Sequence, residues 1–403
     1  MFYHINWFES RAAISPNDTA IIDSDTGESW TYDNLHERAH QLANYFLDNG
    51  VEKGDRVAVL APNHISYFDF LFAAMKIGAI FVPLNWRLGN DELNYVIKDS
   101  SPKIIGVTPL HSKRLIPKGN IKTITLDSNQ YISRLKGKEK NSTVTLSEAD
   151  PLAMIYTGGT TGNPKGVVLS HRSIVWNALN TVVTWNLQQS DTTLTCLPMF
   201  HTGGLNVFSI PLLLVGGKVV ISSEFHPEKA VNDLLKYHCT VVLFVPTMYH
   251  MLIQTDTFNK ANFPHMRFFI SGGAPCPHSI YQAFSEKGIA FKEGYGLTEA
   301  GPNNFYINSN EALKKVGSVG KPMLFNDIQI LSESGEMAKT NETGELLIRG
   351  NHAFEYYWNN PEETKKTKQN GWIHTGDLAR CDDDGYYYIV GRKKDMIITG
   401  GEN

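Results

Sequence analysis

Residues 157–167 read TGGTTGNPKGV, a run of glycines and threonines that leads into a single lysine. The run follows the apolar residues 152–156 and precedes a helix-like segment that starts near Ser170, so it is interpreted as a strand-to-helix connection. Glycine lets consecutive backbone N–H groups point at one anion, and Lys165 adds a full positive charge. The stretch therefore predicts a phosphate-binding loop.

A Walker A loop is the first comparison for such a sequence. That loop requires Gly-Lys followed by Ser or Thr, whereas Lys165 lies between Pro164 and Gly166. The Walker A interpretation is therefore rejected. A plain glycine-rich turn without a ligand is the other alternative, so the rest of the sequence has to decide between a turn and a phosphate site.

Length and composition limit the classes of protein. A chain of 403 residues with 42% hydrophobic content can bury a large core. It is longer than most chains that fold around a single hydrophobic core, so more than one domain or subdomain is expected. The net charge of -4 with scattered basic residues gives no reason to expect a nucleic-acid partner. The four cysteines are far apart and include no CxxC pair, which fits a reducing compartment.

The N-terminus and the apolar runs bear on location. No basic segment is followed by an apolar one at the start of the chain, and the longest apolar stretch, 68–84, is interrupted by Asp69 and Lys76. We expect a cytoplasmic protein with no transmembrane segment. The sequence leaves the oligomeric state open, and a homodimer is one possibility.

The period of the apolar residues alternates along the chain. Residues 56–61 and 79–84 are typical of buried strands, and 64–77 carries apolar residues at helical spacing, which makes a βαβ unit. After the glycine-rich loop, strands are expected near 193–197, 218–222, 241–245, 267–271 and 289–292, between helices that start near 171 and cover 205–214, 227–237, 247–254 and 277–287. The pattern predicts an α/β fold with two doubly wound, largely parallel sheets and helices on both faces.

Beyond residue 320 the pattern changes to short strands at 327–331, 345–349 and 386–390, separated by turn clusters. This predicts a smaller antiparallel β module, similar to a barrel, near the C-terminus. We therefore expect a first α/β subdomain at about 50–170, a second at about 171–320 and the β module at about 321–394. Residues 111–150 are polar and are expected to form a surface excursion.

One motif suggests a different class of protein. Residues 36–40 read HERAH, the HExxH pattern that places two zinc ligands and a general base on one helix face in metalloproteases. Both histidines flank the apolar face of the predicted helix 33–47, and no third ligand is evident. An ordinary surface helix is therefore the preferred interpretation.

Five segments in order resemble the signatures of the acyl- and aryl-CoA ligases in the adenylate-forming superfamily. They are TGGTTGNPKGV at 157–167, PMFH at 198–201, YGLTE at 295–299, TGD at 375–377 and GRKKD at 391–395. The resemblance implies that residues 1–394 form the large N-terminal AMP-binding domain of such an enzyme. The N-terminal βαβ region is compatible with the same fold.

The resemblance also implies roles for individual residues. Lys165 and its loop would wrap the β- and γ-phosphates of ATP, Thr298 would donate to the α-phosphate, and Glu299 would hold Mg²⁺ as an oxygen ligand. With His201, placed between the acyl site and the thiol entry, these residues make up the catalytic set. The nucleotide set comprises Thr157, Gly158, Gly159, Thr160, Thr161 and Gly162 of the loop, Gly272, Gly273, Ala274 and Pro275 beside the adenine, Tyr295 stacked on the base, and Asp377 and Arg392 at the ribose.

The sequence departs from the family pattern in two places. Gly158 stands where the family loop usually has serine, which removes one hydroxyl donor. The sequence also stops at Asn403, shortly after Lys394, which by resemblance is the hinge to a small C-terminal domain that carries a second catalytic lysine. Residues 395–403 would then be the start of that hinge, and we expect reduced activity, thioester formation above all, from this chain alone.

These features predict an ATP-dependent ligase that converts a carboxylic acid to an acyl-adenylate and then transfers the acyl group to CoA. ATP, Mg²⁺ and the co-substrate CoA are the expected cofactors. Segment 202–212 contains no aspartate to pair an amino group, and Val207, Phe208 and Leu212 favour a fatty or aryl acid. Two alternatives stay open: an adenylation domain that loads a carrier protein, and a non-catalytic nucleotide-binding protein.

Overall fold

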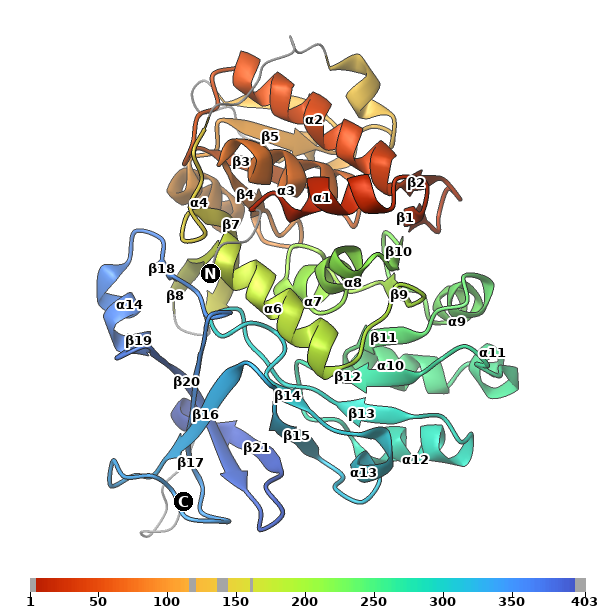
Figure 1. Cartoon of the computed structure of the whole chain (residues 1–403), viewed down its shortest axis with the longest axis vertical. Helices are drawn as coiled ribbons and strands as arrows, with labels where there is room; N and C mark the ends of the chain where they lie inside the picture. The colour runs from red at the N-terminus through yellow and green to blue at the C-terminus, as the bar shows by residue number, and fades with distance from the viewer. Residues whose placement is uncertain (1–4, 116–120, 136–143, 160–161, 396–403) are drawn as a thin grey trace.

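The structure of the chain is a computed structural model that describes residues 5–115, 121–135, 144–159 and 162–395. Three β-sheets and the helices between them form its layers (Figure 1). The predicted α/β class, with two helix-covered sheets and a separate antiparallel sheet toward the C-terminus, is confirmed. Within the described ranges, none of the helices combines the length and the apolar character needed to cross a membrane.

The first sheet has the strand order β18-β8-β7-β4-β3-β5-β6. Its strands from β7 to β6 run parallel, whereas β8 is antiparallel to both β7 and β18. The strands are β3 (Arg56–Leu60), β4 (Ile80–Pro83), β5 (Ile104–Val107), β6 (Lys122–Thr125), β7 (Pro151–Gly159), β8 (Gly162–Ser170) and β18 (Tyr356–Tyr357).

The second sheet has the order β13-β12-β11-β9-β10-β1-β2 and is parallel except for the pair β1 and β2. Its strands are β1 (Thr19–Asp23), β2 (Ser29–Thr31), β9 (Thr192–Thr195), β10 (Lys218–Ile221), β11 (Val241–Phe244), β12 (Phe268–Ser271) and β13 (Phe291–Glu293). The N-terminal strands β1 and β2 thus belong to the second sheet, which the sequence pattern did not indicate.

Helices cover both faces of these two sheets because successive side chains of a buried strand point to opposite sides. In β3, Val57 and Val59 join the core between the two sheets, whereas Ala58 and Leu60 join a separate core beneath α4. Helices α3 and α6 pack on the first sheet, α8 packs on the second, and α6 contacts α8. Helices α9, α10 and α12 cover the far face of the second sheet.

The predicted helices agree closely with observed ones, with one exception, whereas α1, α4, α5, α11, α13 and α14 were not predicted. The predicted helix 205–214 is divided into α7 and α8, because Phe208 has a non-helical φ of -124°. The helices are α1 (Trp7–Ile14), α2 (Tyr32–Asp48), α3 (Ser66–Ile77), α4 (Asn90–Ser100), α5 (Pro109–Ser112), α6 (His171–Thr184), α7 (Thr202–Asn206), α8 (Ser209–Val215), α9 (Pro227–Lys236), α10 (Pro246–Ile253), α11 (Asp256–Lys260), α12 (His278–Glu286), α13 (Ser309–Ala312) and α14 (Pro361–Thr367), with short 3₁₀ turns η1 (Tyr131–Arg134) and η2 (Lys393–Asp395).

The third sheet is antiparallel, with the order β14-β15-β21-β20-β17-β16 and with β19 paired to β20. It lies at the lower left of Figure 1. Its strands are β14 (Phe305–Tyr306), β15 (Ser318–Pro322), β16 (Asn326–Leu331), β17 (Gly344–Gly350), β19 (Lys368–Gln369), β20 (Trp372–Cys381) and β21 (Tyr387–Arg392). The sequence pattern missed β20, which contains the TGD segment.

The glycine-rich loop is not a strand-to-helix connection, so that prediction is wrong. Strands β7 and β8 form an antiparallel hairpin in which Thr157 pairs with Lys165. Residues 162–170 form β8, which was not predicted, whereas α6 begins at His171 as expected. The Ser170 hydroxyl caps α6 by accepting a hydrogen bond from the backbone N–H of Ser173.

The HERAH motif and the segment 111–150 contain residues that are more buried than their polar sequences indicated. Arg38, inside the HERAH motif on α2, forms a buried ion pair with Asp69 at 2.7 Å, and the Tyr131 hydroxyl donates to the same carboxylate. Tyr131 and Ile124 are themselves buried. Part of segment 124–132 therefore packs against the core, which the expectation of a surface excursion did not include, whereas residues 144–150 are exposed or half-buried.

Asn63, in the connection from β3 to α3, links the first sheet to the second. Its side-chain amide donates to the backbone carbonyls of Leu197 (2.9 Å) and Ser222 (3.1 Å), and its carbonyl accepts from the N–H of Met199 (2.8 Å). Leu197 directly precedes the PMFH turn, and Met199 lies within it. One buried side chain therefore fixes this turn against both sheets.

We predict that Asn63→Ala lowers the free energy of unfolding by about 1–3 kcal/mol, because it leaves buried backbone groups without partners. Denaturant titration of the chain measures the change. Asn17→Ala, at an exposed position, is the control and should change the value little. A neutral Asn63→Ala substitution would contradict the bridging role.

Candidate active site

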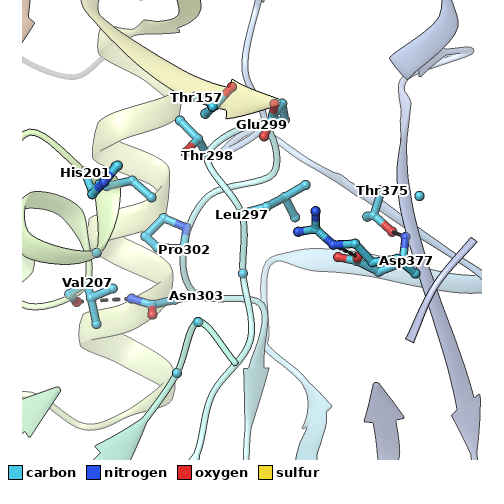
Figure 2. A pocket seen from close by; sticks show the side chains of 18 of the residues that line it. Thr157, His201, Val207, Leu297, Thr298, Glu299, Pro302, Asn303, Thr375 and Asp377 are labelled. Atoms are coloured by element: carbon cyan, nitrogen blue, oxygen red, sulfur yellow. Dashed lines mark hydrogen bonds and ion pairs between the residues drawn. The ribbon is translucent and has the colours of Figure 1, made fainter. Parts of the chain in front are cut away.

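A cavity of about 970 Å³ lies where the β7–β8 hairpin, the second sheet and the third sheet meet. Figure 2 shows Thr157, Thr298 and Glu299 grouped at one end, Asp377 at another, and His201 and Val207 along a third side. The segments that carry the predicted motifs therefore converge on one cavity. Of the predicted site residues, those that line it are Thr157, Gly158, Lys165, His201, Gly272, Gly273, Thr298, Glu299, Asp377 and Arg392.

The hairpin supplies a cation at one end of this cavity. Lys165 forms an ion pair with Glu363 of α14, and its ammonium lies 5.2 Å from the centre of the Tyr357 ring. Gly159 and Gly162 pair with each other at the tip of the hairpin, and Gly162 is not among the residues that line the cavity. Thr160 and Thr161 lie outside the described residues.

Gly166 lets β18 approach the hairpin closely. A Cβ atom at this position would lie 2.9 Å from Met154 Sδ and 3.1 Å from the Cβ of Trp358. The backbone N–H of Trp358 donates to the Gly166 carbonyl at 2.7 Å. A side chain at Gly166 would therefore disturb the pairing that brings residues 356–367 beside Lys165.

Glu299 faces the cavity next to Thr298, which is buried. Burial raises the pKa of Glu299 above its usual range, although the hydrogen bond from the Tyr357 hydroxyl (2.8 Å) and the charge of Lys165 oppose that rise. Only one carboxylate oxygen receives the tyrosine hydroxyl. A hard cation that also binds substrate phosphates needs one or two protein carboxylates, so Glu299 fits such a ligand.

Asp377 and Arg392 are opposite residues on the paired strands β20 and β21. The Arg392 Nε lies 3.2 Å from Asp377 Oδ1, and the Tyr295 hydroxyl donates to Oδ2 at 2.6 Å. Tyr295 itself is not among the residues that line the cavity. The structure thus places Tyr295 behind the carboxylate, where it orients Asp377.

The YGLTE segment and residues 271–275, which read SGGAP, contribute to the cavity wall between Glu299 and Asp377. Gly296 is required here, because a Cβ atom would lie 2.1 Å from the Pro302 carbonyl oxygen. Gly272 and Gly273 line the cavity, whereas Ala274 and Pro275 are exposed and do not. Of the four residues predicted beside the adenine, the two glycines therefore line the cavity.

The remaining part of the cavity is apolar. Its lining side chains are Leu197, Pro198, Val207, Leu243, Val245, Ile270, Leu297 and Pro302. Phe208 and Leu212, which the sequence placed in the same pocket, are buried in the core and do not line this cavity. Asn303 donates to the Val207 carbonyl at 3.1 Å and fixes this wall (Figure 2).

His201 lies between the apolar part and the charged part. Its ring packs 4.6 Å from the Phe200 ring, and it is exposed toward the cavity. Surrounding protein atoms lower the pKa of His201, and the charge of Arg87 adds to this effect. At neutral pH the ring is therefore an uncharged imidazole that can donate or accept one proton.

Further lining residues on the C-terminal segments had no predicted role in the cavity, although Thr375, Lys393 and Lys394 lie inside the TGD and GRKKD motifs. Tyr357 and α14 lacked any recognised motif, and β18 is too short to give a periodic pattern. The Glu345 carboxylate accepts from Lys393 at 2.9 Å and lies 3.7 Å from His374. The additional lining residues are Glu345, Tyr357, Glu363, Lys366, Thr367, His374, Thr375, Lys393 and Lys394.

A family model described as AMP-binding enzyme matches residues 8–358, which include the hairpin, the PMFH turn and the YGLTE segment. The chain belongs to the AMP-binding enzyme family. This AMP-binding enzyme therefore carries the family's motifs around one cavity.

Known relatives of this AMP-binding enzyme are CoA ligases. It is 35% identical over 398 residues to a feruloyl-CoA synthase of an Amycolatopsis species, covering 99% of this chain and 80% of that protein. It is 33% identical over 411 residues to the long-chain-fatty-acid–CoA ligase FadD13 of Mycobacterium tuberculosis, covering 99% and 81%. The solved structure of ATP-bound MatB from Rhodopseudomonas palustris gives a TM-score of 0.89 at 31% identity, over 99% of this chain and 81% of that one. The resemblance to the AMP-forming acid–CoA ligases is confirmed.

We predict that Glu299→Gln stabilises the fold at neutral pH. Because burial raises the pKa of Glu299, its contribution to stability is full below the ordinary glutamate pKa and is lost as the pH rises through the raised value. Glutamine cannot ionise, so the variant should have a higher free energy of unfolding than wild type at pH 7. That advantage should disappear near about pH 4.

Denaturant titrations of both proteins at several pH values provide the measurement. Glu362→Gln, at an exposed position, is the matched control and should follow wild type at each pH. A Glu299→Gln protein that is less stable than wild type at pH 7 would refute the unfavourable burial of this carboxylate.

Proposed function

We propose that this AMP-binding enzyme activates a fatty or aromatic carboxylic acid with ATP and Mg²⁺ and transfers the acyl group to CoA. The observation that carries the proposal is the continuity of one cavity from a charged end to an apolar end. The charged end carries Lys165, Glu299 and Asp377, and the apolar end is lined by Val207 and its neighbours. An anionic nucleotide and an apolar acid could meet between them.

The charged groups of the cavity could bind the triphosphate of ATP on one side and its ribose on the other. Lys165 would bind the β- and γ-phosphates as a charge-assisted donor, and Thr298 would donate to the α-phosphate. Asp377, oriented by Tyr295 and Arg392, would accept hydrogen bonds from the ribose hydroxyls. Attack of a carboxylate on the α-phosphate brings two anions together, so fixed donors around the phosphate stabilise the charge that develops there.

A magnesium ion bound with ATP would be held by Glu299, with the phosphates supplying further oxygen ligands. The ion would offset charge on the phosphate oxygens during displacement. On the protein side, the Tyr357 hydroxyl keeps the Glu299 carboxylate oriented toward the cavity. Thr298, the preceding residue, would then donate a hydrogen bond to the α-phosphate.

The acid is proposed to bind in the apolar part of the cavity. The carboxylates that line the described cavity are Glu299, Glu345, Glu363 and Asp377, and segment 202–212 contributes none. An ammonium group buried there would have no counter-ion, at a cost of several kcal/mol. Fatty and aromatic acids carry no such group. His201 lies beside this part and would separate it from the route by which the thiol enters.

We predict that Lys165→Ala weakens binding of MgATP by roughly 10- to 100-fold, since a hydrogen bond to a charged group contributes about 1.5–3 kcal/mol. Isothermal titration calorimetry on the 403-residue chain measures the affinity. Lys365→Ala, at an exposed position on α14, is the control and should bind as wild type does. Failure of the wild type to bind MgATP at millimolar concentration would exclude the proposed phosphate site.

We predict that ATP–pyrophosphate exchange is faster with medium-chain fatty acids or aromatic acids than with any amino acid. The reason is that, among the residues that the structure describes, none with a carboxylate lines the apolar part of the cavity. A panel of acids at equal concentration tests this order, with a no-acid reaction as the control. Faster exchange with an amino acid would favour a domain that loads a carrier protein, and the absence of exchange with every acid would favour a nucleotide-binding protein without catalysis.

A further inference from the structure

Lys165 and Glu363 form an ion pair across the mouth of the charged end of the cavity. The two residues are 198 positions apart in sequence, and both line the cavity. Their side chains are 36% and 31% exposed, so neither is buried as a structural core pair would be. The same ammonium that is proposed to bind ATP phosphates therefore already has a carboxylate partner.

The position of Glu363 is fixed by the fold rather than by a flexible loop. Strand β18 pairs with β8, and Tyr357 lies opposite Val167, two residues from Lys165. The backbone N–H of Tyr357 donates to Thr364 Oγ1 at 2.9 Å, which ties α14 to β18. The Asn360 side chain accepts from the N–H of Glu363 at 3.2 Å and caps the helix. Glu363 is thus held where its carboxylate reaches Lys165.

A carboxylate in this position must compete with phosphate. Lys165 provides one ammonium, and the face of the Tyr357 ring already covers part of it. A β- or γ-phosphate that approaches Lys165 would lie within a few ångströms of the Glu363 carboxylate, and the two anions repel each other. The ligand can bind Lys165 fully only if the carboxylate turns away.

We propose that Glu363 sets the affinity of the site by competing with the β- and γ-phosphates of ATP for Lys165, and that it also favours the departure of pyrophosphate. This inference rests on the proposed function, because it requires ATP phosphates at Lys165. Glu363 is a positioning residue that acts through the lysine. Its charge makes the polyphosphate site weaker than the lysine alone would make it, so the site binds MgATP and still releases pyrophosphate.

The test compares Glu363→Gln with wild type by calorimetry, using MgATP, magnesium pyrophosphate and AMP as ligands. A partly exposed ion pair is worth a few tenths to about 1 kcal/mol, so the variant should bind MgATP and pyrophosphate about two- to fivefold more tightly. AMP has no β- or γ-phosphate, and its affinity should not change. Glu363→Asp keeps the charge and should return the affinities toward wild type.

Glu362→Gln provides the matched control. Glu362 lies on the same helix, is 79% exposed on its side chain and is 3.9 Å from Lys365 rather than Lys165. The Glu362→Gln substitution removes the same charge from α14 but leaves the Lys165–Glu363 ion pair intact. The affinities for all three ligands should therefore stay at the wild-type values. An equal gain in Glu362→Gln would show that only the net charge matters and would overturn the inference.

The other outcomes are also decisive. Weaker or unchanged MgATP binding in Glu363→Gln, or an equal change for AMP, overturns the competition between Glu363 and phosphate. A structural clamp would instead lower the thermal midpoint and weaken all three ligands together. If wild type binds MgATP and Glu363→Gln shows no gain, only this inference fails. If wild type does not bind MgATP, the proposed function fails, and the inference fails with it.

Discussion

The short pairing of β18 with β8 is the constraint on which the charged end of the cavity depends. It consists of backbone hydrogen bonds from Trp358 to Gly166 and from Glu355 to Val168, and it brings together segments that are far apart in the chain. The close approach favours glycine at position 166, because a Cβ atom there would crowd the Met154 side chain and the Cβ of Trp358. Without the pairing of β18 with β8, Tyr357 would not reach Glu299 and α14 would not lie beside the hairpin.

A second regularity follows from that arrangement. Each carboxylate that lines the described cavity receives a specific donor: Lys165 for Glu363, Tyr357 for Glu299, Tyr295 and Arg392 for Asp377, and Lys393 for Glu345. Partly buried charges are stable only when they are paired or hydrogen-bonded. A ligand that binds these side chains would therefore have to replace existing partners.

The sequence predicted those parts of the molecule that depend on local pattern. The βα alternation gave the two helix-covered sheets, and the motifs gave Lys165, Thr298, Glu299 and Asp377, which the structure brings to one cavity. The hairpin was mistaken for a strand-to-helix connection because β8 begins inside the glycine-rich run, and its apolar residues 167–169 are too few to show the period of a strand. Glu363 and Tyr357 could not be found, since their place depends on a two-residue strand that pairs with a segment far earlier in the chain.

The sheet order also has a consequence for how the chain folds. The first sheet includes β18 near residue 357, and the second sheet includes β1 near residue 20, which pairs with β10 about 200 residues later. Neither sheet is a continuous stretch of polypeptide. Closing such long loops is entropically costly and slows folding. During synthesis, neither sheet can be completed until distant segments have emerged, so a cut near residue 170 should give two fragments that each lack edge strands rather than two domains that fold alone.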